Sequence, residues 1–187
     1  MFRTILVAAA VVVATVASAG AAPLAWRIAG TGAGTLDGAD WSGRFAFTIH
    51  GDSANHVDEF GVNVVSPLDS VALRIAGVGT AVLQPVTSLG YNDHEGVVFL
   101  GRVGDTDLFN FDVDAPIDLA RHFAPVIGRH VYALNQFLDV PTSLGALTFD
   151  TSSDVAFSAV PLPAAAPLLV VALAGAGLLA GVRRRAA

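Results

Sequence analysis

The alternation that decides the fold is clearest in Trp41-Ser42-Gly43-Arg44-Phe45-Ala46-Phe47-Thr48-Ile49-His50. Every second position from Trp41 to Ile49 carries a large apolar side chain or a glycine, and the positions between them are small or polar. Successive side chains of a strand point to opposite faces, so this period of two predicts a strand with one buried face. A helix would instead repeat its apolar residues every three to four positions.

The same alternation recurs through residues 20–159. Further strands are predicted at residues 71–75, 79–83, 97–103, 109–113, 146–150 and 155–159. Turns are predicted between them at residues 51–52, 77, 90–93, 104–105 and 151–154, where glycine and aspartate gather. Two segments stay ambiguous, because residues 129–140 also fit a helical period and residues 118–123 fit one helical turn. Short strands at this spacing predict an all-β domain, an antiparallel β-sandwich or a jelly-roll-like fold.

Charge is concentrated in the middle of the 187-residue chain. All sixteen acidic residues lie between Asp37 and Asp154, and residues 20–159 hold six arginines, a formal charge of −10 against −6 for the whole chain. A nucleic-acid-binding protein needs a cationic face to replace counterions on phosphate, so this balance excludes that class. The lack of cysteine excludes a disulfide scaffold, a cysteine-ligated zinc site and a lipid-modified N-terminal cysteine.

The first 19 residues have the three parts of a secretory signal peptide. A positively charged start precedes an apolar run, and small residues follow at Ala17 and Ala19. Residues 4–19 are shorter than the roughly 20 apolar residues that span a bilayer, which favours removal over a retained membrane helix. Signal peptidase cleavage is expected after Ala19, with Ala21 and Ala22 as alternatives.

Residues 160–187 form a second apolar end. Residues 164–182 carry no charge and would span about 28 Å as a helix at about 1.5 Å per residue, so a transmembrane helix is predicted there. Arg183-Arg184-Arg185 would stop translocation, because each arginine costs about 2.5–3.5 kcal/mol at a helix centre. The tail therefore predicts one inner-membrane helix with the acidic domain outside that membrane, and an ordinary permanent anchor remains one interpretation.

This tail resembles a known sorting signal. Val160-Pro161-Leu162-Pro163-Ala164, the apolar span and the terminal arginines are similar to the VPLPA-type PEP-CTERM signals. In that family an exosortase, a polytopic membrane cysteine protease, recognises the proline-containing motif and removes the tail. The resemblance implies that Val160, Pro161, Leu162, Pro163 and Ala164 are the recognition site, and that Arg183, Arg184 and Arg185 hold the precursor in the membrane. It also implies a Gram-negative cell and a destination in the envelope or an exopolysaccharide matrix.

Two motifs suggest chemistry but are predicted to be turns. Gly30-Thr31-Gly32-Ala33-Gly34 has the glycines of a phosphate-binding loop, but no helix follows, so a hairpin loop is predicted. Residues 47–53, which end at Ser53, superficially resemble the nucleophile block of GDSL-type esterases. That family needs a late Asp-x-x-His, whereas Asp118 and His122 have the wrong spacing, and a serine without a base is a weak nucleophile. No catalytic residue is assigned.

No metal site is predicted either. The histidines match no zinc signature and are expected in exposed loops: His50, His56, His94, His122 and His130. The aspartates near the middle of the chain do not fit an EF-hand loop, because Phe109 and Asn110 occupy positions that such a loop reserves for a ligand and a glycine. The alternation predicts a solvated acidic face formed by Asn110, Asp112 and Asp114. A weak calcium site between loops, including Asp105 and Asp107, is the only cofactor hypothesis.

The aromatic residues offer little for sugar stacking. Trp26 and Trp41 share a face with apolar neighbours and are expected in the core, which leaves Tyr91 and Tyr132. The sequence therefore predicts a secreted, surface-sorted, non-enzymatic protein with a structural or adhesive role. The alternatives are a polysaccharide-binding module, with or without calcium, and a permanently anchored protein with a periplasmic β domain. A further alternative is a hydrolase in which Ser53 or two nearby carboxylates converge with a histidine in a pocket. Expected partners are signal peptidase, an exosortase-type protease, the inner membrane and exopolysaccharide.

Overall fold

A computed structural model describes residues 24–84, 86–102, 106–132 and 136–161 of the chain. These residues belong to one compact unit, Pro23–Pro161. The predicted signal peptide, with Ala17 and Ala19, lies outside the described residues. The larger part of the predicted tail, from Leu162 onward, does so as well.

The described residues of this unit form strands joined by turns, together with a short 3-10 helix, η1, at Ser53–Asn55. The first strands are β1 Leu24–Leu36, β2 Ala39–Gly51, β3 His56–Glu59, β4 Val62–Val65, β5 Ser70–Ile75 and β6 Gly79–Val82. The remaining strands are β7 Val86–Asn92, β8 Val97–Arg102, β9 Thr106–Val113, β10 Phe123–Tyr132, β11 Val140–Thr142 and β12 Gly145–Pro161. The prediction of an all-β, antiparallel domain is confirmed.

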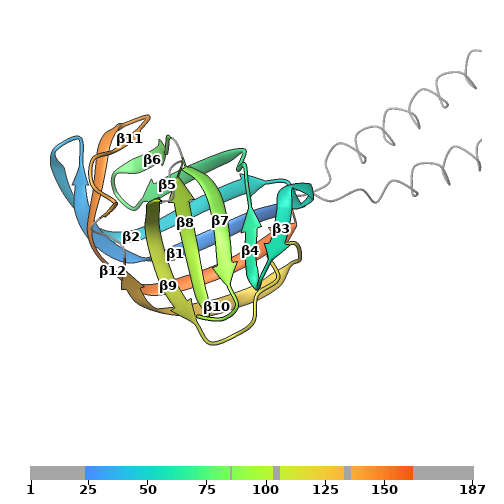
Figure 1. Ribbon diagram of the computed structural model, residues 1–187. Helices are drawn as coiled ribbons and strands as arrows, with labels where there is room; N and C mark the ends of the chain where they lie inside the picture. The colour runs from blue at the N-terminus through green and yellow to red at the C-terminus, as the bar shows by residue number, and fades with distance from the viewer. Residues whose placement is uncertain (1–23, 85, 103–105, 133–135, 162–187) are drawn as a thin grey trace, which may run out of the picture. The chain divides into compact units, whose positions relative to one another are not determined.

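The strands form one curled antiparallel sheet (Figure 1). Its order is β3-β4-β7-β8-β9-β10-β12-β1-β2-β5-β6, and β11 pairs with β12 away from this path. Strand β10 joins the two halves of the sheet, because it pairs with β9 on one side and with β12 on the other. The hairpin of β1 and β2 turns at Asp37 and Gly38, which have positive φ angles of 51° and 77°. Two-residue hairpin turns with positive φ at both residues match the right-handed twist of the flanking strands.

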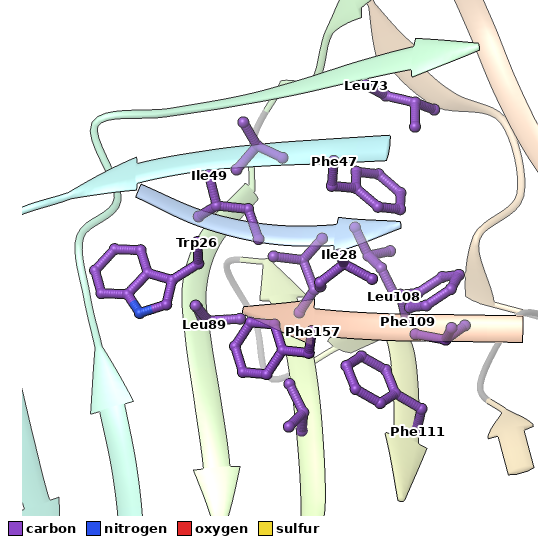
Figure 2. Close-up of a cluster of buried hydrophobic side chains, with 14 of the residues drawn as sticks. Trp26, Ile28, Phe47, Ile49, Leu73, Leu89, Leu108, Phe109, Phe111 and Phe157 are labelled. Carbon is purple, nitrogen blue, oxygen red and sulfur yellow. The ribbon is translucent and has the colours of Figure 1, made fainter. Parts of the chain in front are cut away.

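The two halves of the sheet meet through aromatic side chains (Figure 2). Phe109 of β9 lies 5.5 Å from Phe47 of β2 and 5.8 Å from Phe149 of β12, measured between ring centroids. Phe111 of β9 similarly lies 5.9 Å from Phe157 of β12. Since all these side chains are at most 2% exposed, the curl of the sheet encloses one continuous core.

The glycine-rich segment is not the predicted loop but the middle of strand β1. Gly30 pairs with Phe45, and Gly34 pairs with Trp41 and Phe149 in the neighbouring strands. A Cβ atom at Gly32 would lie 2.7 Å from the Thr151 carbonyl oxygen and 3.3 Å from the rings of Phe45 and Phe149. Glycine is required here because the neighbouring backbone and the aromatic rings occupy the space of a side chain.

Three other local predictions were wrong or are now decided. The predicted turn at residues 151–154 lies inside β12, where the register with β1 shifts and Asp154 has a φ of 52°, as in a β-bulge. The turn predicted at residues 90–93 begins only after Asn92, because Gly90 is in β7 opposite Phe99. The described part of the ambiguous segment at residues 129–140 holds the end of β10 and the start of β11, with no α-helix.

Both ends of the compact unit lie side by side in the sheet. Strand β12 continues two residues past the expected boundary at Ala159, and its last residues Val160 and Pro161 pair with Ala25 and Leu24 of β1. The chain therefore enters and leaves the domain at neighbouring positions. Within the described residues, no helix has the length and apolarity needed to cross a bilayer.

Candidate functional site

A depression on the described surface lies over strands β12, β1, β2 and β5. It has a volume of about 740 Å³, within the range of small-ligand sites. Its floor is a row of three outward-facing alanines on β12, β1 and β2, in which Ala156 pairs with Ala29 and Ala29 pairs with Ala46. Arg74 on β5 pairs with Ala46 and continues this row. These four positions alternate with core residues of the same strands, so the curled sheet itself supplies the floor.

Three arginines surround this floor, and we call the site the arginine depression. Arg27 lies two residues before Ala29 on β1, and Arg44 lies two residues before Ala46 on β2. Because β1 and β2 are antiparallel, these two arginines flank the alanine row on opposite sides, and Arg74 closes its β5 end. All three side chains are exposed and line the depression.

None of these three guanidinium groups forms an ion pair with a described residue. Elsewhere in the described chain, Arg121 pairs with Asp118 at 3.0 Å and Arg129 pairs with Asp114 at 2.6 Å. Three cations at one place therefore have no ion-pair partner among the described residues, although the domain has sixteen acidic residues. Guanidinium groups present several donors in a planar fork that matches carboxylate and phosphate groups, so this arrangement is suited to an anionic ligand.

The fourth side of the arginine depression is polar rather than cationic. The Asp154 carboxylate accepts hydrogen bonds on Oδ2 from the hydroxyl of Thr31 at 3.1 Å and from the hydroxyl of Ser153 at 3.3 Å. The positive φ of Asp154 belongs to the β12 bulge described above. The bulge thus places one acceptor beside three cations.

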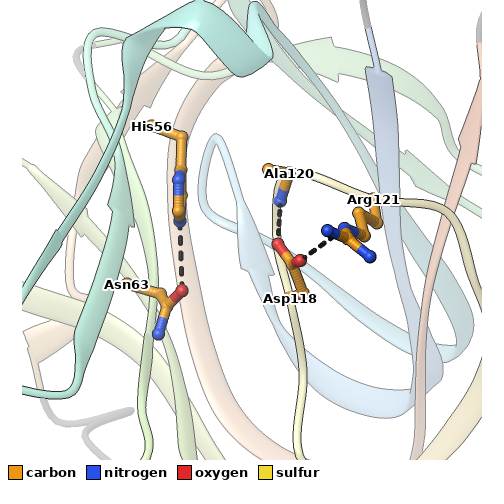
Figure 3. Close-up of polar contacts among 5 residues, drawn as sticks. All are labelled: His56, Asn63, Asp118, Ala120 and Arg121. Carbon is orange, nitrogen blue, oxygen red and sulfur yellow. Dashed lines mark hydrogen bonds and ion pairs between the residues drawn. The ribbon is translucent and has the colours of Figure 1, made fainter.

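The prediction of exposed loop histidines holds for His94 and His122 and was wrong for the other three, which lie in strands. His50 in β2 and His56 in β3 are half-buried, and His130 is exposed in β10. His56 contacts the Asn63 amide oxygen at 3.1 Å across the β3–β4 ladder (Figure 3). His94 contacts the Phe60 carbonyl oxygen at 2.9 Å, and His130 contacts the Asp112 carboxylate at 3.0 Å. Among the residues that the structure describes, no three His, Asp or Glu side chains converge as a metal site.

The predicted acidic face of β9 is only partly solvated. Asp112 and Asp114 have the partners named above, and Asp105 lies outside the described residues. Asn110 is 7% exposed and donates from its amide to Asp107 at 2.9 Å, so its predicted solvent exposure was wrong. The reason is its position in the sheet, because its cross-strand partners are Phe99 of β8 and Tyr132 of β10.

The two tyrosines have different environments. Tyr91 is 3% exposed in β7 and donates its hydroxyl to the Ala115 carbonyl oxygen at 3.4 Å, so it cannot form the sugar platform considered from the sequence. Burial, and then the charge of Asp93, raise its pKa. Tyr132 is 40% exposed, and burial followed by a hydrogen bond with Asp112 raises its pKa to about 12. Trp26 and Trp41 are buried, as predicted.

Ser53 begins the 3-10 helix that directly follows β2. Asp52 is the N-cap of this helix and accepts a hydrogen bond from the backbone N–H of Ala54 at 2.8 Å. The predicted polar turn after the strand is therefore confirmed. Asp118 also serves a turn, since it accepts from the backbone N–H of Ala120 at 2.9 Å and pairs with Arg121 (Figure 3). His122 is exposed.

The predicted sorting residues are divided by the limit of the described chain. Val160 and Pro161 are the last residues of β12, whereas Leu162, Pro163 and Ala164 lie outside the described residues. Arg183, Arg184 and Arg185 also lie outside them. Comparison with protein-family models, with curated proteins and with solved structures gave no match.

Sequence reasoning missed the arginine depression, although a signal for it was present. Each of its arginines precedes an alanine by two residues, in Arg27-Ile28-Ala29, Arg44-Phe45-Ala46 and Arg74-Ile75-Ala76. In each triplet the central residue is buried in the core. The arginine and the alanine must therefore share the outer face, but only the strand order shows that the three triplets are neighbours.

Proposed function

We propose that this chain is an exported envelope or matrix protein with a structural or adhesive role, delivered by a signal peptide and a removable C-terminal tail. In this proposal a sandwich-like β domain is flanked by the signal peptide and by a transmembrane sorting helix. An exosortase-type protease recognises Val160-Pro161-Leu162-Pro163-Ala164 and releases the domain from Arg183-Arg184-Arg185 and the inner membrane. The domain itself is non-enzymatic and needs no cofactor.

The observation that carries this proposal is the position of the motif at the edge of the folded unit. The motif begins on the last two residues of β12, which are also the last residues of the compact unit Pro23–Pro161. Cleavage within or after the remainder of the motif would leave the sheet intact. At the other end, each of the expected signal peptidase sites, after Ala19, Ala21 or Ala22, precedes the first strand residue Leu24.

A second candidate function is polysaccharide binding. The arginine depression favours it, because it provides cations, an acceptor and a small apolar floor in one place. The calcium-assisted form of this hypothesis has less support, since Asp112 and Asp114 are already paired with His130 and Arg129. A hydrolase based on Ser53 is not favoured by the two depressions described, because neither is lined by Ser53 or by a histidine.

Mass spectrometry of the mature C-terminus, on protein isolated from fractionated cells of the natural host, tests the proposed sorting. The expected product ends between Pro161 and the start of the apolar span and is found in the envelope or medium. A matched variant, Pro161→Ala with Pro163→Ala, is expected to keep its tail and remain in the inner membrane, because the rigid extended motif is lost. A stable envelope form that retains Arg183-Arg184-Arg185 would contradict the proposal and favour a permanent anchor.

A further inference from the structure

We propose that the arginine depression binds an acidic polysaccharide through the carboxylate groups of its sugars. This inference rests on the proposed function, since only an exported domain meets such a polymer. Arg27, Arg44 and Arg74 would hold the carboxylates on three sides of the alanine row. The site would thereby provide the attachment on which an adhesive role depends.

The cations of the site are available for a ligand. An arginine that serves stability in an acidic protein is expected beside a carboxylate, as Arg121 and Arg129 are. Arg27, Arg44 and Arg74 are exposed and form no ion pair with a described residue. Arg44 and Arg74 lie on neighbouring strands two positions apart, since Arg74 pairs with Ala46, so an anion between them would offset the repulsion of these two like charges.

The rest of the site favours a sugar over a simple inorganic anion. Asp154 would repel a phosphate or sulfate, but its carboxylate can accept hydrogen bonds from sugar hydroxyls. Both of its hydroxyl donors reach Oδ2, and no donor among the described residues reaches Oδ1. The methyl groups of Ala29, Ala46 and Ala156 form a low apolar floor that can contact the C–H face of a sugar ring. An acidic sugar carries a carboxylate for the arginines, hydroxyls for Asp154 and a C–H face for the alanine floor.

The charge of the domain favours a single polysaccharide strand over an anionic membrane surface as the ligand of the depression. Residues 20–159 carry a formal charge of −10, so a membrane rich in anionic lipid would be repelled over the whole contact area. A single polysaccharide strand crossing the depression approaches only the local cations. Charges farther away than the Debye length, about 8 Å at physiological ionic strength, are largely screened from it.

Isothermal titration calorimetry on the full chain in a non-ionic detergent tests this proposal. The probe is a galacturonic acid trimer, with its neutral methyl ester, inorganic phosphate and phosphatidylglycerol vesicles as comparison ligands. We expect the trimer to bind, and binding to weaken about tenfold or more in Arg44→Gln and in Arg74→Gln, because each variant loses a charge-assisted hydrogen bond. Arg74→Lys keeps the positive charge but loses the planar guanidinium group with its several donors. Its loss of affinity should therefore be smaller than that of Arg74→Gln.

The matched control is Arg121→Gln, which removes an exposed arginine outside the depression and should change the affinity less than twofold. Equal losses in Arg121→Gln and Arg44→Gln would overturn the proposal, because binding would then depend on net charge alone. Equal affinity for the methyl ester or for phosphate, binding to the vesicles alone, or no binding to the trimer would overturn it as well. None of these results bears on tail removal, which the mass spectrometry measures separately.

Discussion

Phe149 is a central side chain of the aromatic cluster that fills the core between the two halves of the sheet. It is 2% exposed in β12 and contacts five aromatic rings from three other parts of the chain. The distances between ring centroids are 4.9 Å to Trp41, 5.1 Å to Phe45, 5.8 Å to Phe47, 5.8 Å to Phe109 and 4.9 Å to Phe137. Most of these pairs are edge-to-face, a geometry that adds to the effect of burial alone.

Phe149→Ala is therefore expected to lower the free energy of unfolding by about 4 kcal/mol. Truncation of a buried phenylalanine to alanine costs about 3–5 kcal/mol, and the number of ring partners keeps Phe149 away from the lower end of that range. With a denaturant dependence of about 2 kcal/mol per molar urea, the midpoint should fall by about 2 M. Tryptophan fluorescence can follow the transition, because Trp41 is buried against Phe149.

Phe60→Ala is the matched control, since it removes the same side chain from a site that is 94% exposed. Its effect on the free energy of unfolding should stay within about 0.5 kcal/mol. A loss of less than about 1 kcal/mol in Phe149→Ala, or equal losses in the two variants, would refute the enclosed core between the two halves of the sheet.

Three further predictions concern a close backbone contact, the tyrosines and the last strand. Gly34→Ala should destabilise the fold by at least about 1–3 kcal/mol in urea unfolding, because its Cβ would overlap the Thr148 carbonyl oxygen, whereas a loop glycine would tolerate the change. Phenolate absorbance of the native protein should rise only well above pH 10. Tyr91 and Tyr132 have raised pKa values in the folded state, so the stabilising contribution of each is present below about pH 10. The contribution of Tyr132 is lost as the pH rises through about 12, and that of Tyr91 as the pH rises through its raised pKa. Half of the absorbance change appearing near pH 10 would contradict this assignment. Deletion of the chain from Val160 onward should weaken hydrogen-exchange protection at the start of β1 relative to deletion from Leu162 onward, because Val160 and Pro161 pair with Ala25 and Leu24.

Much of the fold followed from local sequence pattern. The alternation in residues 41–50 predicted β2, and the same pattern located β5, β6, β8 and β9 to within a few residues. These predictions succeeded because side-chain direction in a strand has a strict period of two, which one buried face makes visible. Trp26 and Trp41 were placed in the core for the same reason.

The errors arose at residues whose environment is set by a neighbour that is distant in sequence. Gly30, Gly32 and Gly34 suggested a loop, but they are needed for the approach of Phe45, Phe149 and the β12 backbone. Asn110 was predicted to lie on a solvated face, but it is covered because Phe99 and Tyr132 are its cross-strand partners. Local pattern carries no information about these partners, because pairing between strands depends on the order of the sheet.

The sequence alone determined the strand character of the domain, its acidic charge and the apolar ends from which export and sorting are proposed, since each is a property of neighbouring residues. Only the tertiary structure decided that the strands form one curled sheet and that Val160 and Pro161 complete its last strand. It also brought Arg27, Arg44 and Arg74 together on one outer face. The physical reason is that hydrogen-bonded strand pairing, which places distant segments about 4.8 Å apart, is a property of the whole sheet and of no single segment.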